Sequence, residues 1–150
     1  MDETSPCFPY LFAFPFIWIS GLIAFGIWRR RNAGKPIFAR RPPKATFFET
    51  WASGRNLRTW CTRLGGANRC LVVTVIDGRL QVEPGFPINI MLPLDLYGLT
   101  VDVRLSDIRS VESRSAFLVG EKVIIHWKGD QGRELVVKDA DGLMAALRKA

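Results

Sequence analysis

The residues best suited to chemistry are three cysteines and one histidine, Cys7, Cys61, Cys70 and His126. No pair among them has the short spacing of a structural metal site, and a lone histidine without neighbouring cysteines cannot complete a zinc site. A nucleophile–base pair would need Ser or Cys within hydrogen-bond reach of His126, and no sequence motif indicates one. We therefore predict that the chain is not an enzyme and has no cofactor or metal. The alternative is an enzyme or a regulatory subunit of a larger membrane complex whose motif is not visible in the sequence.

One long segment is uncharged and strongly apolar. Residues 4–28 carry no charge, and Phe8 to Trp28 is almost entirely aromatic or aliphatic. At about 1.5 Å rise per residue, a helix of this length reaches roughly the 30 Å hydrocarbon thickness of a bilayer. The segment lacks the basic start and small-residue cleavage site of a secretory signal peptide. We therefore predict a transmembrane helix over 8–28, after a short extracytoplasmic N-terminus at 1–7.

Positive charge is concentrated directly after this segment. Arg29, Arg30 and Arg31 follow at once, and positions 29–63 hold ten basic residues and one acid, Glu49. Because basic loops stay in the cytoplasm, we predict a single-pass protein of the bacterial inner membrane, with its N-terminus out and its C-terminal domain cytoplasmic. The formal net charge of +7 lies beside the membrane, so it does not indicate nucleic-acid binding. These charges either meet anionic lipid or only fix the topology.

The remainder divides into a spacer and a domain. Residues 29–44 are rich in Arg and Pro and have no apolar periodicity, which predicts a basic, Pro-rich linker. In the domain at 45–150, Asp77-Gly78 separates two apolar runs and predicts a tight hairpin. Alternating patterns predict further strands at 99–104 and 108–112 and a second hairpin at 122–128 and 133–138. An opening strand at 47–52 is expected to end at Ser53-Gly54.

A short helix is predicted at the C-terminus, over 141–149. Asp139 or Asp141 can cap it, and Leu143, Met144 and Leu147 form an apolar stripe that can cover a sheet. The predicted fold class is therefore a transmembrane helix plus a mainly β domain. That domain is a bent antiparallel barrel or sandwich of about seven strands, capped by the C-terminal helix.

Over residues 45–150 the chain resembles the bacterial pleckstrin-homology-like (PH-like) domains. The resemblance is carried by the segments CLVVTVIDGRLQVEP, GFPINIMLPLDLYGL and VRLSDIRSVE, and by the final hairpin and helix. Ile108 and Val111 match a helper motif of these domains. The resemblance implies two nearly orthogonal sheets capped by the terminal helix. It does not extend to the lipid-headgroup pattern of the eukaryotic relatives.

Two stretches of the domain are candidate binding surfaces. A basic stretch after the first strand could contact anionic lipid, although a solvated loop or a short amphipathic element packed on the domain has the same pattern. Its residues are Arg55, Arg58, Trp60, Arg63 and Arg69. An unusually apolar stretch from Gly85 to Tyr97 could form a partner or self-association surface, pack over the barrel mouth, or dip into the bilayer. Its residues are Phe86, Ile88, Ile90, Met91, Leu92, Leu94 and Leu96.

These features together predict a membrane-anchored PH-like module for binding or scaffolding. We expect it to engage a protein partner or anionic lipid at the cytoplasmic membrane face.

Overall fold

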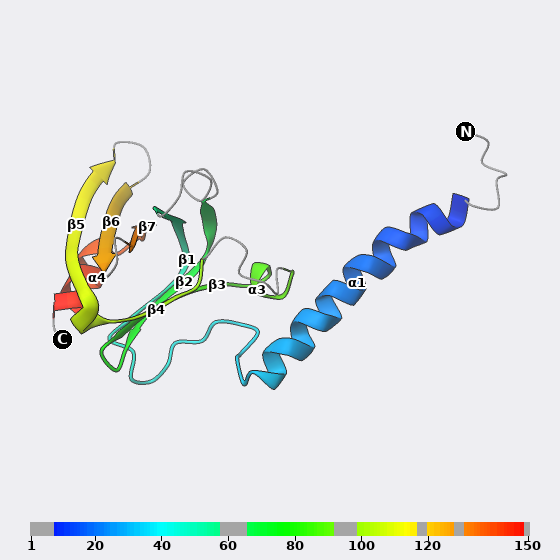
Figure 1. Ribbon diagram of the computed structural model, residues 1–150, viewed down its shortest axis with the longest axis horizontal. Helices are drawn as coiled ribbons and strands as arrows, with labels where there is room; N and C mark the ends of the chain where they lie inside the picture. Colours follow the sequence, from blue (N-terminus) through cyan, green and yellow to red (C-terminus); the bar gives the residue numbers. More distant parts are fainter. Residues whose placement is uncertain (1–7, 58–65, 92–98, 117–119, 128–130, 149–150) are drawn as a thin grey trace.

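A long helix projects from a β-rich domain in the computed structural model, which describes residues 8–57, 66–91, 99–116, 120–127 and 131–148 (Figure 1). The elements in chain order are α1 (Phe8–Asn32), β1 (Phe47–Asn56), β2 (Ala67–Ile76), β3 (Arg79–Pro84), α3 (Ile88–Met91), β4 (Val101–Arg104), the 3-10 turn η1 (Leu105–Asp107), β5 (Ile108–Ala116), β6 (Gly120–Trp127), β7 (Gln131–Val136) and α4 (Ala140–Arg148).

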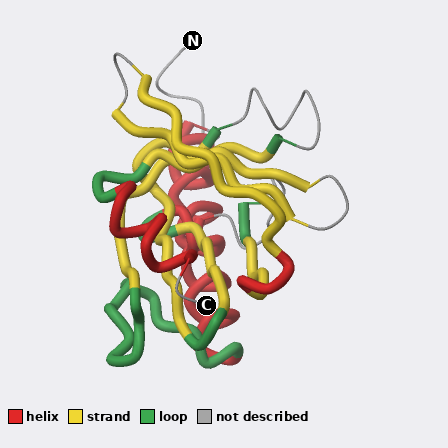
Figure 2. The backbone as a smooth tube through the Cα atoms, turned by 90° about the vertical axis from the view of Figure 1, so that its left-hand side faces the viewer, coloured by secondary structure: helices red, strands yellow, loops and turns green. Residues whose placement is uncertain are grey.

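The strands form one antiparallel sheet of seven, in the order β4-β3-β2-β1-β7-β6-β5. The sheet is strongly curved (Figure 2). The predicted mainly β domain with about seven antiparallel strands is therefore confirmed. The sheet is open, however, with β4 and β5 at its two edges, so its hydrogen bonds do not close a barrel. The chain passes from one edge to the other directly through η1.

Strand β1 joins the two halves of the sheet and is longer than predicted. Its residues pair with β2 and then with β7, and the register shifts on both sides of Ala52. The predicted end at Ser53-Gly54 is wrong, because Gly54 serves close packing rather than a turn. A Cβ on Gly54 would lie 2.8 Å from Leu135 Cδ2 and 3.0 Å from Leu71 Cδ1, so glycine lets the strand pass between its neighbours.

Both predicted hairpins are present. Asp77 and Gly78 have φ values of 49° and 69°, as a two-residue turn with two left-handed positions requires. The second hairpin pairs Trp127 with Gln131. The predicted short strand at 108–112 extends to Ala116, because it pairs with β6 over that whole length.

The core lies inside the curve of the sheet and is closed by α4. Leu71, Val73 and Ile125 are fully buried, and so is Leu143 of α4. The confirmed C-terminal helix is capped by Asp139, whose Oδ1 accepts a hydrogen bond of 2.8 Å from the Gly142 amide. The Glu49 carboxylate of β1 accepts bonds from the backbone amides of Lys138 and Asp139, which ties the start of α4 to the sheet.

One charged side chain is buried in this core. Arg133 of β7 is 2% exposed, and its guanidinium donates to the backbone carbonyl of Leu99, just before β4. The contact links β7 to the segment just before β4, and these two strands lie four places apart in the sheet order, so it bridges the curve from inside.

The predicted helix at 8–28 is present but ends later, at Asn32. Arginine is a good helix former, so Arg29–Arg31 continue the helix instead of ending it. The end is set by Gly34, with φ of 66°: its amide donates to Arg31 O, and the Lys35 amide donates to Arg30 O. This is the Schellman arrangement. Within the described part of the chain, no helix combines the length and apolarity that a membrane crossing needs.

Candidate functional site

The described residues are most distinctive where α1 meets the β domain. Helix α3 lies against α1 at Gly26, where an added Cβ would lie 2.1 Å from the backbone oxygen of Ile90. Ile90 is 6% exposed. Only a glycine allows the two backbones to approach this closely, so the junction is built around Gly26.

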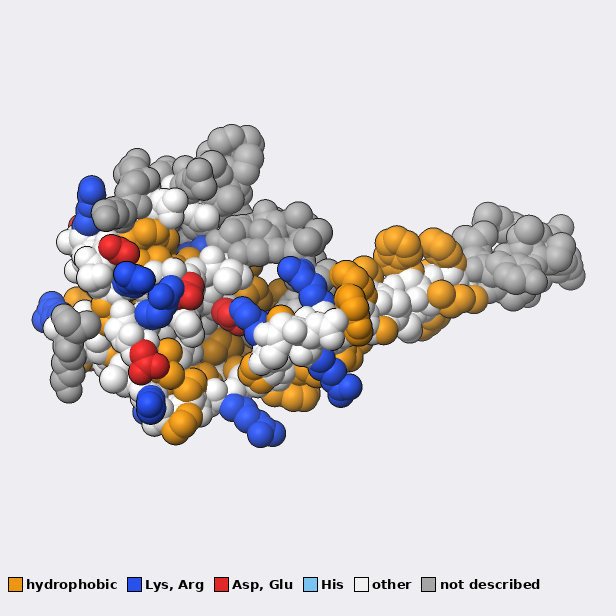
Figure 3. Space-filling view, turned by 60° about the horizontal axis from the view of Figure 1, so that its bottom comes forward, with side chains coloured by type: hydrophobic (Ala, Val, Ile, Leu, Met, Phe, Trp, Pro, Cys, Tyr) orange, Lys and Arg blue, Asp and Glu red, His pale blue; other side chains and the backbone are white. Residues whose placement is uncertain are grey.

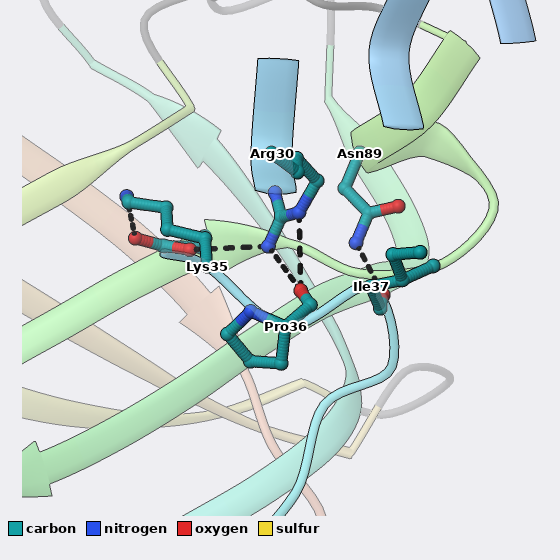
Figure 4. A network of polar contacts seen from close by, with 6 residues as sticks. Arg30, Lys35, Pro36, Ile37 and Asn89 are labelled. Carbon is teal, nitrogen blue, oxygen red and sulfur yellow. Dashed lines mark hydrogen bonds and ion pairs between the residues drawn. The ribbon is translucent and has the colours of Figure 1, made fainter. Parts of the chain in front are cut away.

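Polar contacts tie the chain after α1 to the domain (Figure 4). Arg30 Nε and Nη2 donate to the carbonyl of Pro36 at 3.1 and 2.9 Å. The Glu83 carboxylate of β3 accepts a bond of 2.5 Å from Lys35 Nζ and lies 3.8 Å from Arg30 Nη2. Asn89 Nδ2 of α3 donates to the Ile37 carbonyl at 2.8 Å. The first part of the predicted linker is therefore held against β3 and α3.

Two hollows flank this held segment. The first has a volume of about 410 Å³, and three cations, Arg30, Lys35 and Arg40, are among its lining residues. Figure 3 shows Lys and Arg side chains gathered where α1 joins the domain. We call this hollow the cationic hollow. Asn89 also lines it, and the buried Asn89 Oδ1 has no hydrogen-bond partner among the described residues.

The second hollow, here the apolar hollow, has a volume of about 240 Å³. Phe38 and Phe86, whose ring centroids are 4.9 Å apart, form part of its lining together with Trp51 and Cys70. Burial raises the pKa of the Cys70 thiol, so this thiol stays neutral at physiological pH and is a small apolar lining group rather than a nucleophile. Ala39, Val72 and Gly85 line both hollows, which therefore adjoin.

The predicted lipid-facing residues are described only in part. Arg58, Trp60 and Arg63 lie outside the described residues. Arg69 at the start of β2 is exposed, with φ of 50°, and its amide donates to Ser53 Oγ at 2.9 Å. Arg55 Nη2 lies 2.7 Å from Glu134 Oε2. The Arg55 guanidinium is therefore engaged within the sheet.

Glu134 forms ion pairs with two cations on its neighbouring strands. Lys122 Nζ lies 3.1 Å from Glu134 Oε1, on the other side from Arg55. Burial on its own raises the pKa of the Glu134 carboxyl, but the hydrogen bonds and charges of Arg55 and Lys122 outweigh burial and hold this pKa below its ordinary value. The cluster stabilises the β1–β7–β6 pairing at neutral pH.

The predicted partner surface is divided by the fold. Leu92, Leu94 and Leu96 lie outside the described residues. Ile90 is buried at the contact with α1, and Ile88 is half-buried. Phe86 and Met91 are 41% and 47% exposed. The apolar block thus packs against the chain's own helix and also presents two large side chains to the outside.

The three predicted topology residues occupy the last turn of α1, where cations suit the negative end of the helix dipole. Arg29 and Arg31 are exposed, whereas Arg30 is partly buried in the junction. Among the described residues, no group of His, Cys, Asp and Glu side chains is placed to hold a metal ion. His126 lies on β6, paired with Ser110 and Gly132.

Sequence reasoning missed the residues that build the junction: Gly26, Lys35, Glu83 and Asn89. Asn89 carried a usable signal, because a single amide inside the apolar run Ile88–Met91 needs a hydrogen-bond partner wherever that run is buried. Gly34 followed by Pro36 is a recognisable helix stop. Nothing local marks Glu83, which is one of several acids at strand ends.

Comparison of the sequence with protein-family models and with curated proteins finds no match.

Proposed function

We propose that this chain is a membrane-anchored binding module of PH-like fold, whose domain engages a protein partner or anionic lipid at the cytoplasmic membrane face. The observation that carries the proposal is the exposure of α1. All residues from 13 to 22 are exposed, which covers every side of that part of the helix, with Phe16 at 71%, Ile17 at 70% and Trp18 at 61% exposure.

A helix that is apolar all round needs an apolar environment, either a protein core or lipid. Burial of apolar area is worth about 25 cal/mol per Å², so several fully exposed aromatic side chains are costly in water. Insertion of α1 into a bilayer removes that cost. The basic residues that follow it, beginning with Arg29, favour retention of the domain on the cytoplasmic side.

The arrangement of the domain supports the PH-like part of the proposal. Antiparallel strands followed by one C-terminal helix that closes the core agree with the resemblance, although the strands form one curved sheet instead of the two nearly orthogonal sheets that it implies. Anchoring raises the effective concentration of such a domain at the membrane for any partner held there. Phe86, just before α3, and Met91, at its end, are exposed and are the described side chains best placed to meet that partner.

The test is flotation of the full-length protein with liposomes, followed by alkaline extraction. We expect wild-type protein to float with neutral and anionic vesicles and to resist extraction. The double variant Ile17→Asp/Trp18→Asp should lose both properties, because each acid costs about 2.5–3.5 kcal/mol at the centre of a membrane helix. Ser113→Asp, on an exposed position of β5, is the control. Wild-type protein that stays soluble and monodisperse without detergent would contradict the proposal.

Orientation is tested separately, by protease protection of a C-terminal tag in inverted and right-side-out membrane vesicles. Digestion in inverted vesicles only is the expected result. Digestion in right-side-out vesicles only would reverse the proposed topology.

A further inference from the structure

We propose that the junction between α1 and the β domain binds a single anionic glycerophospholipid. The phosphate-bearing headgroup lies in the cationic hollow and part of one acyl chain in the apolar hollow. This inference rests on the proposed membrane anchoring of α1, and it places the lipid site away from the basic stretch after β1.

The charge of the cationic hollow suits a phosphate. Arg30, Lys35 and Arg40 line it, together with the acids Glu83 and Asp102. Asp102 is already paired with Arg79, at 2.7 Å. With Asp102 neutralised by Arg79, which lies outside the lining, the three lining cations are opposed by Glu83 alone, and this leaves a surplus of two positive charges. Arg and Lys form charge-assisted hydrogen bonds with phosphate oxygens.

A buried acceptor belongs to a residue that lines the same hollow. Asn89 is 7% exposed; its Nδ2 is used by Ile37, and its Oδ1 has no partner among the described residues. An unpaired buried acceptor is costly. A hydroxyl on the headgroup would satisfy it, so the preferred headgroup carries both a phosphate and a hydroxyl, as phosphatidylglycerol does.

The apolar hollow supplies the place for a hydrocarbon chain. Its volume of about 240 Å³ equals that of roughly eight water molecules at about 30 Å³ each, which suits a part of one acyl chain. Phe38, Trp51 and Phe86 provide aromatic walls. A fully polar ligand would leave these walls uncovered, and a fully apolar ligand would leave the cations without a partner.

The two hollows adjoin, and with α1 in a bilayer they lie where lipid is available. Ala39, Val72 and Gly85 line both of them, so one amphiphilic molecule can occupy the pair. Arg30 belongs to the last turn of α1, where a membrane-inserted helix reaches the headgroup level. A bilayer lipid can therefore enter sideways without leaving its layer completely.

The experiment uses full-length protein in phosphatidylcholine nanodiscs doped with phosphatidylglycerol. Protein is released in mild detergent, and retained lipid is counted by native mass spectrometry. We expect wild type to retain a single phosphatidylglycerol. Arg40→Gln should weaken retention roughly fivefold, the worth of one surface cation near anionic lipid. The matched control is Arg41→Gln. Arg41 is the neighbour of Arg40 and is also exposed, but it is not among the residues lining the hollow, so the Arg41→Gln protein should retain the lipid.

A third variant tests the chain contact. Ala39→Leu adds bulk where the two hollows meet and should abolish retention while the thermal unfolding temperature stays at the wild-type value. Phosphatidylmethanol, a phosphodiester of the same single negative charge without a headgroup hydroxyl, should be retained less well than phosphatidylglycerol. Excess free glycerol 3-phosphate should not displace the lipid.

Several results would overturn the inference. Equal retention of phosphatidylcholine, or equal loss in the Arg40 and Arg41 variants, would show that the cations act only through general surface charge. Displacement by glycerol 3-phosphate would make this a site for a soluble phosphate. Protein that enters nanodiscs but retains no anionic lipid would end this inference and leave the proposed function standing, whereas failure to enter nanodiscs would end both.

Discussion

The contact between α1 and α3 makes a sharp prediction about Gly26. In Gly26→Ala the added methyl would lie 2.1 Å from the oxygen, 2.8 Å from the carbonyl carbon and 3.0 Å from the Cα of Ile90. These are backbone atoms, so no rotamer change relieves the overlap. Helix α3 must therefore move away from α1.

The size of the effect follows from what the contact contains. Ile90 is 6% exposed, and burying an Ile side chain is worth about 1.5–3 kcal/mol. The Asn89–Ile37 hydrogen bond, which separation also threatens, adds about 0.5–1.5 kcal/mol. The docked arrangement should thus lose about 2–4.5 kcal/mol. The helix itself gains up to about 1 kcal/mol from Gly to Ala, so α1 does not unfold.

Pulsed electron resonance between two spin labels measures the docking directly. Labels at Leu22→Cys on α1 and Ser113→Cys on β5, with the native cysteines replaced, should give one narrow distance in wild type. Gly26→Ala should broaden and shift the distribution. Gly21→Ala is the matched control, because a Cβ there meets nothing within 4 Å. A Gly26→Ala distribution identical to that of Gly21→Ala would refute the reasoning.

Three further predictions concern the domain. The folded-state pKa of Glu134 lies below its ordinary value of 4.5, so its ion pairs stabilise the fold above that pH and are lost as pH falls through the lowered pKa. Glu134→Gln should therefore flatten the fall in melting temperature below pH 4.5. An unchanged profile would exclude Glu134 as the source of this fall. Asp139→Ala should lower the free energy of unfolding, measured in urea, by about 1 kcal/mol through loss of the helix cap, and Asp141→Ala should lower it clearly less. Equal losses would contradict the assigned cap. Arg133→Ala should cost about 3 kcal/mol in urea unfolding, because it leaves a cavity in the core and removes the hydrogen bond to the Leu99 carbonyl. A cost below that of the cap would argue against a bridging role.

Local signals were sufficient for the hairpins of the domain. Asp77-Gly78 can adopt the two left-handed conformations of the turn at low cost, and the flanking alternation then fixes which side chains face the core. The same reasoning failed at Gly54. Its lack of a side chain serves the approach of Leu71 and Leu135, a tertiary requirement that looks like a turn signal in the sequence.

The end of α1 shows a different source of error. The predicted span stopped where charge began, because the change from apolar to basic marks a membrane boundary. A helix does not end for that reason. The left-handed Gly34 and the following Pro36 set its end, and Arg29–Arg31 complete the last turn.

The junction could not be predicted from sequence because its contacts join residues far apart in the chain. Lys35 meets Glu83 across 48 positions, and Asn89 meets Ile37 across 52. Their combined effect is to hold the domain against α1. Gly26 precedes the arginines by less than one helical turn, so α3 docks at the level where the apolar part of α1 ends. If α1 lies in a bilayer, as we propose, this places the domain at the depth of the lipid headgroups, and partners or lipids held there have an advantage over ligands in free solution.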